Sequence, residues 1–120
     1  MLPKEKRLRT ERDFKRVYMR GSFFSLRFFN VNYAPNRLGF TRLAFVVNKK
    51  TAKKAVERNE IKRKLREIFR ALYDTLPTGY DVIVNVKREA LEAKSDALRA
   101  EAQKVPERLR PAGGKKGGNR

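Results

Sequence analysis

Apolar residues recur at helical spacing in three segments of the chain. The longest pattern runs from Ala55 to Tyr73 and forms a single stripe that must be buried. The residues of this stripe are Ile61, Leu65, Ile68, Phe69 and Leu72. A shorter helix is expected after Thr10, which can cap it, and should end before Gly21. A weaker stripe predicts a last helix over Glu89–Val105.

Four other segments have the pattern of β-strands. Phe28–Ala34 alternates between apolar residues on one face and asparagines on the other. Leu43–Asn48 is apolar almost throughout, which is typical of a central strand. Tyr80–Val86 alternates again, and a shorter strand is expected near Ser22–Leu26.

The order of these elements, αβββαβα, predicts an α+β fold in which helices pack on a small sheet as an α-β sandwich. Such a sheet can leave part of one face open. Residues 1–110 are expected to form one domain, because the length suits a single modest core. Residues 111–120 are rich in Gly and Lys, which predicts a disordered basic tail.

The charge balance points to an anionic partner. Lys and Arg number 31 against 13 Asp and Glu, a net charge of +18 that repels itself in a compact fold. The N-terminus lacks the apolar stretch of a signal peptide, and no apolar run is long enough to span a bilayer, so we expect a cytoplasmic protein. The absence of His and Cys argues against catalysis and metal binding by protein side chains.

The long helix carries cations on the side opposite its apolar stripe. With a rotation of about 100° per residue, four polar residues point away from the apolar stripe, and Lys62 lies at one margin of this polar side. The four residues are Asn59, Arg63, Arg66 and Arg70. The same projection places Glu60 and Glu67 at the other margin, away from the arginines. This sorting by sign favours contact with a polyanion over a merely solvated face.

Two further groups of residues could contact RNA. Cations at the junction between the apolar strand and the long helix can meet phosphates together with the free N–H groups of the first helical turn. These cations are Lys49, Lys50, Lys53 and Lys54. Phe14 and Tyr18 on the first helix could stack on bases of single-stranded RNA, and Asn30 and Asn32 on the polar strand face could add hydrogen bonds.

Several short motifs occur together in this chain. Lys49-Lys50 at a strand end is followed by Arg58-Asn59 and then by Ile61-Lys62-Arg63 on the helix. Asp13-Phe14, Val17-Tyr18 and Gly21 precede them, and Asp81-Val82-Ile83-Val84 follows. Together these motifs resemble the bacterial ribonuclease P protein subunit over about residues 8–86. One departure is Glu60, which stands where the family motif has its second Arg.

The resemblance implies a mixed sheet with a left-handed βαβ crossover, as in a ribosomal-protein domain. It also implies that a partner RNA cleaves precursor tRNA with Mg²⁺, held mainly by RNA, and releases the 5′ leader, so the chain would be the non-catalytic protein component of an endoribonuclease. By position, one set of residues would face the catalytic RNA: Arg58, Asn59, Lys62, Arg63 and Arg66. Phe14 and Tyr18, with Arg9, would line the cleft for the leader.

Other functions fit the charge as well. A structural RNA-binding protein of the ribosomal type would have the same composition and fold, but its binding should ignore the leader. A DNA-binding or membrane-surface protein is less favoured, because the chain has neither a dimerisation heptad nor a second helix suited to reading a groove.

Overall fold

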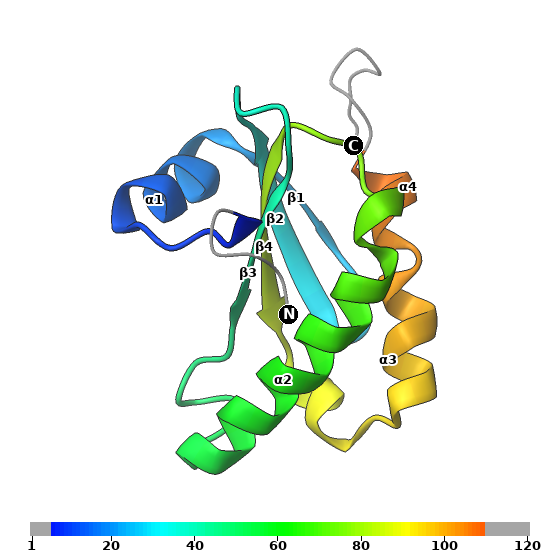
Figure 1. The fold of residues 1–120 in the computed structure, drawn as a ribbon. Coiled ribbons are helices and arrows are strands. Elements are labelled where there is room, and N and C mark those ends of the chain that lie inside the picture. The colour runs from blue at the N-terminus through cyan, green and yellow to red at the C-terminus, as the bar shows by residue number, and fades with distance from the viewer. Residues whose placement is uncertain (1–5, 110–120) are drawn as a thin grey trace.

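The computed structural model describes residues 6–109 (Figure 1). The helices and strands follow one another as α1 (Glu11–Arg20), β1 (Ser22–Ser25), β2 (Phe29–Pro35), β3 (Arg42–Val46), α2 (Ala55–Leu72), β4 (Tyr80–Val86), α3 (Ser95–Ala102) and α4 (Val105–Arg108). Short 3-10 turns, η2 (Tyr73–Thr75) and η3 (Arg88–Glu92), follow α2 and β4. The order confirms the predicted α+β sandwich. The predicted tail, 111–120, lies outside the described residues.

The last helix differs from its prediction, because the segment forms η3, α3 and α4 instead of one helix over Glu89–Val105. Pro106 sits in the first turn of α4. Proline lacks a backbone N–H and is tolerated only in a first turn, so the chain starts a new helix there. Glu101 of α3 is buried, and its carboxylate accepts hydrogen bonds from the backbone N–H groups of Arg27 and Phe28 at 3.0 and 2.5 Å. The broken helix is thereby tied to the turn between β1 and β2.

The sheet is mixed, with strand order β1-β2-β4-β3. The β1–β2 and β2–β4 pairs are antiparallel, whereas β3 and β4 are parallel neighbours. Helix α2 connects β3 to β4 through a left-handed crossover (Figure 1). Parallel strands usually prefer the opposite hand, so only the family resemblance suggested this connection.

The prediction that Leu43–Asn48 forms a central strand is wrong, because β3 lies at the edge of the sheet. The strand is apolar because both of its faces are covered: Leu43 belongs to the main core, and Ala44 to a smaller cluster on the other face. Its outer edge is also paired, since Arg7 forms a parallel bridge with Leu43 and the Leu8 N–H donates to the Leu43 carbonyl at 2.8 Å.

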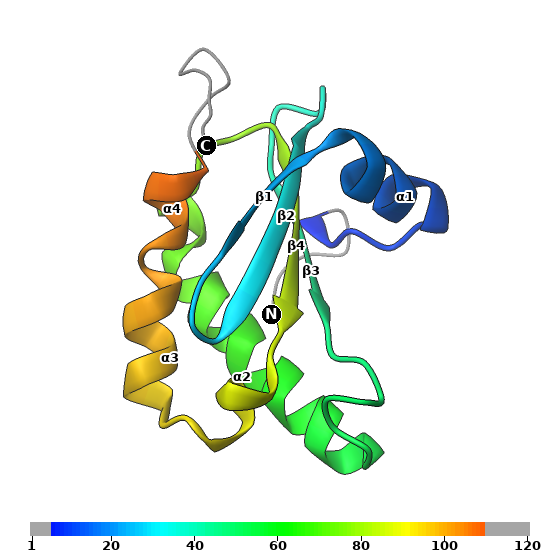
Figure 2. The same ribbon diagram turned by 180° about the vertical axis from the view of Figure 1, so that it is seen from behind.

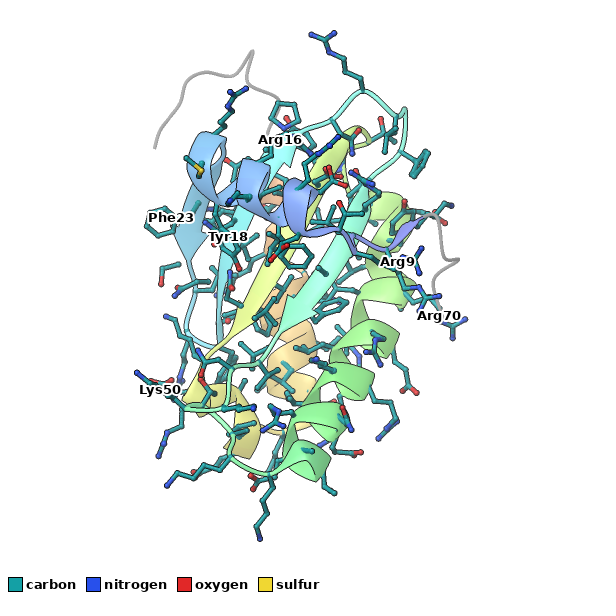
Figure 3. The ribbon with its side chains drawn as sticks, turned by 90° about the vertical axis from the view of Figure 1, so that its left-hand side faces the viewer. Arg9, Arg16, Tyr18, Phe23, Lys50 and Arg70 are labelled. Atoms are coloured by element: carbon teal, nitrogen blue, oxygen red, sulfur yellow. The ribbon has the colours of Figure 1, made fainter. Side chains whose placement is uncertain are left out.

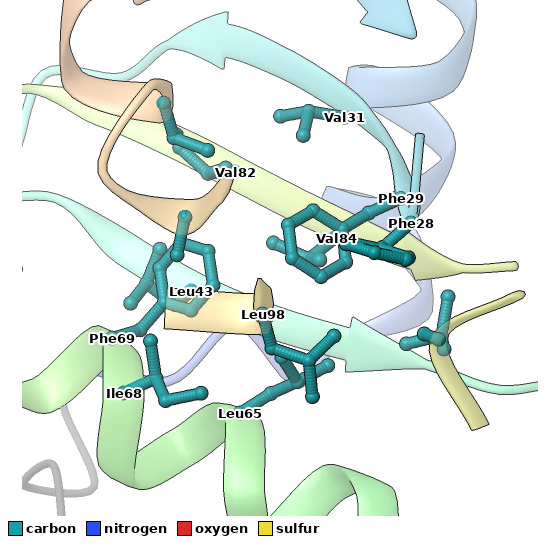
Figure 4. Packing of buried hydrophobic residues seen from close by; sticks show 14 of the residues in the cluster. Phe28, Phe29, Val31, Leu43, Leu65, Ile68, Phe69, Val82, Val84 and Leu98 are labelled. Atoms are coloured by element: carbon teal, nitrogen blue, oxygen red, sulfur yellow. The ribbon is translucent and has the colours of Figure 1, made fainter. Parts of the chain in front are cut away.

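The sheet separates two unequal layers (Figures 1 and 2). Helices α2, α3 and α4 cover one face, where Phe29 and Val84 of the sheet meet Leu65, Phe69 and Leu98 of the helices (Figure 4). Helix α1 covers only part of the other face, over a cluster of Leu8, Val17, Ala34, Ala44 and Ile83. The rest of that face is not covered by a helix (Figure 2). Asn30 and Asn32 of β2 lie on it, because the alternating residues Phe29 and Val31 face the main core.

Candidate RNA-binding surface

A buried carboxylate anchors α1 to the sheet. Asp81 of β4 is fully buried and accepts two hydrogen bonds of 2.8 Å from Arg42, one of 2.8 Å from Asn36, and another from Arg16 of α1. Arg42 also pairs with Asp13 of α1 at 3.2 Å. Because two arginines from different elements share one carboxylate, the helix has a fixed position beside the open part of the sheet.

Local capping completes this anchor. The Thr10 hydroxyl accepts a hydrogen bond from the Asp13 backbone N–H at 3.2 Å and donates one to the Asp13 carboxylate at 2.7 Å. The hydrogen bond from Thr10, followed by the charge of Arg42, holds the pKa of Asp13 below its usual value. The predicted cap at Thr10 is therefore present, and it keeps a carboxylate ionised in the first turn, where the helix dipole favours negative charge.

Amide groups line the open face of the sheet below α1. The Tyr18 hydroxyl donates to Asn85 Oδ1 at 2.8 Å, and Asn85 Nδ2 donates to Asn32 Oδ1 at 2.9 Å. On the next row, the Ser25 hydroxyl donates to Asn30 Oδ1 at 2.6 Å. Burial raises the pKa of the Tyr18 phenol, so Tyr18 keeps its proton and remains a donor at neutral pH. The predicted Tyr18, Asn30 and Asn32 thus lie on one connected surface.

A cavity of about 230 Å³ joins α1 to α2. The residues around it come from the N-terminal segment, α1, β3 and α2: Arg7, Leu8, Arg9, Phe14, Leu43, Ala44, Phe45 and Arg66. Phe14 is half-buried, and its ring centroid lies 6.5 Å from that of Tyr18. The family resemblance implied that Arg66 faces the catalytic RNA and that Arg9 and Phe14 face the leader, and the fold brings all three around one cavity.

Three cations of α2 form a row at helical spacing along one side of the helix, with Lys62 and Arg66 half-buried and Arg70 exposed. Lys62, Arg66 and Arg70 are four residues apart, and none of them is in an ion pair within residues 6–109. Arg70 is exposed and lies on the same side of the molecule as Arg9 (Figure 3). Asn59 is also exposed. This row keeps its positive charge available to a polyanion.

The predicted separation of Arg63 from the acids is wrong. Arg63 pairs with Glu60 at 2.8 Å and with Glu67 at 3.2 Å, and these contacts lower the pKa of Glu60 and raise that of Arg63. The projection considered only the direction of each Cα–Cβ bond. A long guanidinium can reach acids three residues before it and four residues after it on the same helix.

The cations before α2 fall into two groups. Arg58 is half-buried, and its Nη1 donates to the carbonyls of Ala52 and Lys53 at 2.9 Å, so its guanidinium stabilises the loop that enters the helix. The predicted lysines of this loop are exposed: Lys49, Lys50, Lys53 and Lys54. Figure 3 shows Lys50 at the far end of the open face from Arg9. The loop and the α2 row therefore border that face at separate places.

Sequence reasoning missed three residues of this face. Asn85 joins Tyr18 to Asn32, Lys87 Nζ donates to the Ser25 hydroxyl at 3.0 Å, and Phe23 of β1 is 67% exposed. The alternation of β4 contained the signal for Asn85, because Val82, Val84 and Val86 face the core and the residues between them must face the other way. Phe23 had no such signal, since its neighbour Phe24 is equally apolar and is buried.

The described residues contain neither of two other kinds of site. Within residues 6–109, no group of three or more His, Cys, Asp or Glu side chains could hold a metal ion. In the same part of the chain, no helix is both long enough and apolar enough to cross a membrane.

These features define a basic α+β protein with a cationic helix beside an open, amide-lined sheet. Known proteins are similar to this chain in sequence and in fold. The Ribonuclease P family model matches residues 2–110. A ribonuclease P protein component from Caldanaerobacter subterraneus is 37% identical over 105 residues, which cover 88% of this chain and 90% of that protein. Another, from Pseudanabaena, is 42% identical over 92 residues, 72% of this chain and 75% of that protein.

Solved structures agree with the sequence comparison. The ribonuclease P protein of Thermotoga maritima superposes with a TM-score of 0.80 at 29% identity, over 88% of this chain and 98% of that chain. A structure of the Staphylococcus aureus ribonuclease P protein gives 0.75 at 30% identity, over 83% and 91%. The chain belongs to the family of bacterial ribonuclease P protein components, which are RNA-binding proteins of tRNA processing.

Proposed function

We propose that this chain is the non-catalytic subunit of a cytoplasmic ribonucleoprotein that removes the 5′ leader from precursor tRNA. It binds the catalytic RNA through α2 and the leader through the open sheet face. The observation that carries this proposal is the shared cavity, which is lined by Arg66 of α2 together with Arg9 and Phe14. One surface can therefore hold the catalytic RNA and the leader side by side.

The unpaired row on α2 supports the contact with the catalytic RNA. Lys62, Arg66 and Arg70 can each neutralise a phosphate, and Asn59 can donate a hydrogen bond beside them. Each phosphate contact releases counterions, so affinity should fall steeply with salt. Arg63 contributes less than the motif suggests, because RNA must first compete with Glu60 and Glu67.

The open face supports binding of a single strand. Phe14 and Tyr18 are partly exposed rings beside the amides of Asn30 and Asn32. Aromatic rings accept stacked bases of any sequence, and amides donate to base edges. Lys50 lies at the border of the same face (Figure 3), and the exposed lysines of its loop can follow the backbone of the RNA strand.

In this proposal the hydrolysis belongs to the partner RNA. Mg²⁺ held by RNA phosphates would supply the activated water and charge stabilisation for this hydrolysis. The chain binds and orients the two RNAs, and its net charge of +18 reduces their mutual repulsion. It should therefore lower the Mg²⁺ concentration that cleavage requires.

Reconstitution at low Mg²⁺ tests the role of α2. Adding the chain to a cognate catalytic RNA should restore cleavage of precursor tRNA, and the double variant Lys62→Glu/Arg66→Glu should abolish this rescue. The control, Lys94→Glu/Lys104→Glu, makes the same charge change at exposed positions at the starts of α3 and α4 and should keep it. Rescue by both variants would remove the α2 row from the mechanism.

Binding assays test the role of the leader. Phe14→Ala should weaken binding of precursor tRNA more than binding of mature tRNA, because only the precursor carries the strand that Phe14 contacts. If wild-type protein bound both tRNAs equally, the alternative of a structural RNA-binding protein without a processing role would be favoured.

A further inference from the structure

An exposed phenylalanine lies on the open face, outside the residues assigned above. Phe23 of β1 is 67% exposed, whereas the next residue, Phe24, is buried in the core. Phe23 pairs in register with Asn32 of β2, so its side chain is on the same face as the Asn32 amide. Figure 3 shows Phe23 and Tyr18 on this side of the molecule, with Phe23 at the margin of the sheet.

A tight corner fixes β1 relative to α1. The Gly21 N–H donates to the Val17 carbonyl at 2.9 Å, and β1 begins at the next residue. A Cβ atom at Gly21 would lie 2.3 Å from the Tyr33 carbonyl oxygen and 2.5 Å from that of Val17. The end of α1 therefore lies directly against β2, and the ring of Phe23 has a defined position two residues beyond the corner.

Hydrogen-bond donors lie on the same face as this ring, at the register position of Phe23 and at that of Ser25. Asn32 Oδ1 accepts from Asn85 and Asn30 Oδ1 accepts from Ser25, which leaves both amide nitrogens without a partner within residues 6–109. Lys87 Nζ donates to the Ser25 hydroxyl and so brings a positive charge to the Ser25–Asn30 pair. An aromatic surface, amide donors and a cation are the groups that hold a nucleotide of single-stranded RNA.

We propose that Phe23 stacks on a base of the leader, beyond the bases at Phe14 and Tyr18, so that the leader continues across the sheet to β1. This inference rests on the proposed leader-binding function of the same face. A second copy of the chain is a poorer occupant, because β1 has only four residues and two copies that each carry a charge of +18 repel one another.

Fluorescence of 2-aminopurine, placed at successive leader positions of precursor tRNA in the complete ribonucleoprotein, tests this proposal. Stacking on Phe23 should quench one upstream position, and Phe23→Ala should relieve that quenching and weaken binding of long-leader substrate about 5- to 150-fold. Phe23→Tyr keeps an aromatic ring, so it should retain both the quenching and the affinity for long-leader substrate. Binding of substrate with a leader too short to reach β1 should not change.

Met19 offers a matched control, because it is a nearby apolar side chain that is 77% exposed on α1, and Met19→Ala should alter neither signal. If Phe23→Ala discriminates between precursor and mature tRNA as well as the wild type does, this inference is wrong and the proposed function still stands. No discrimination in the wild type would overturn both. Self-association of the wild type that Phe23→Ala abolishes, with RNA binding unchanged, would assign the residue to a protein interface instead.

Discussion

Removing the buried carboxylate of Asp81 should destabilise the fold strongly. Asp81→Ala leaves Arg16 and Arg42 without their shared acceptor, and breaking a buried ion pair costs about 3–5 kcal/mol. The side chains of these arginines are 31% and 18% exposed, and Arg42 retains Asp13, so water and the second acid offset part of the loss. We therefore expect Asp81→Ala to lower the free energy of unfolding by about 3 kcal/mol.

Urea denaturation followed by circular dichroism measures this loss. A domain of this size has a free energy of unfolding of about 5–15 kcal/mol, so the midpoint should move clearly. The control, Asp74→Asn, changes an exposed carboxylate and should stay within about 0.5 kcal/mol of the wild type. A loss below about 1 kcal/mol in Asp81→Ala would refute the assignment of Asp81 as the anchor of α1.

The same variant separates the two RNA contacts. Because Asp81 bonds to Arg16 of α1 and has no hydrogen bond or ion pair with α2 within residues 6–109, folded Asp81→Ala protein should lose preference for precursor tRNA. Its affinity for the catalytic RNA should remain. Equal losses for both RNAs would show that the position of α1 does not control leader binding.

Three further changes test other contacts. The Thr10 hydrogen bond lowers the pKa of Asp13, so the ionised carboxylate stabilises the fold at pH values above its unfolded pKa of about 4. This stabilisation is lost as the pH falls through the lower pKa of the folded state. In Asp13→Asn, the melting temperature should therefore fall less steeply with decreasing pH than in the wild type. Glu60→Gln/Glu67→Gln removes both acids that pair with Arg63, so it should release Arg63 to RNA and steepen the slope of log K against log salt by about 0.7–0.9, whereas an unchanged slope would exclude a phosphate contact by Arg63. Gly21→Ala should destabilise the fold by about 1–3 kcal/mol in denaturant titrations, and wild-type stability would contradict the tight corner.

Part of the candidate site followed from local patterns. Tyr18, Asn30 and Asn32 were found from periodicity and lie on one face. Lys62 is half-buried, as its expected place at the margin of the polar side of α2 suggests, whereas Arg66 was expected opposite the stripe and is half-buried beside the cavity. Such patterns are reliable because a helix or strand fixes the direction of each Cβ atom. Contacts made by long side chains are not fixed in this way. The pairing of Arg63 with both acids was therefore predicted incorrectly.

The amino-acid sequence by itself determined the strands, the first two helices, the charge and the buried stripe of α2, because these depend on spacing of a few residues along one chain. Only the tertiary structure decided that β3 lies at the edge and that Arg9, Phe14 and Arg66 surround one cavity. These features depend on which distant segments pair. Strand pairing across tens of residues is set by how the whole core packs, and an apolar run looks the same whether a neighbouring strand or the N-terminal segment covers it.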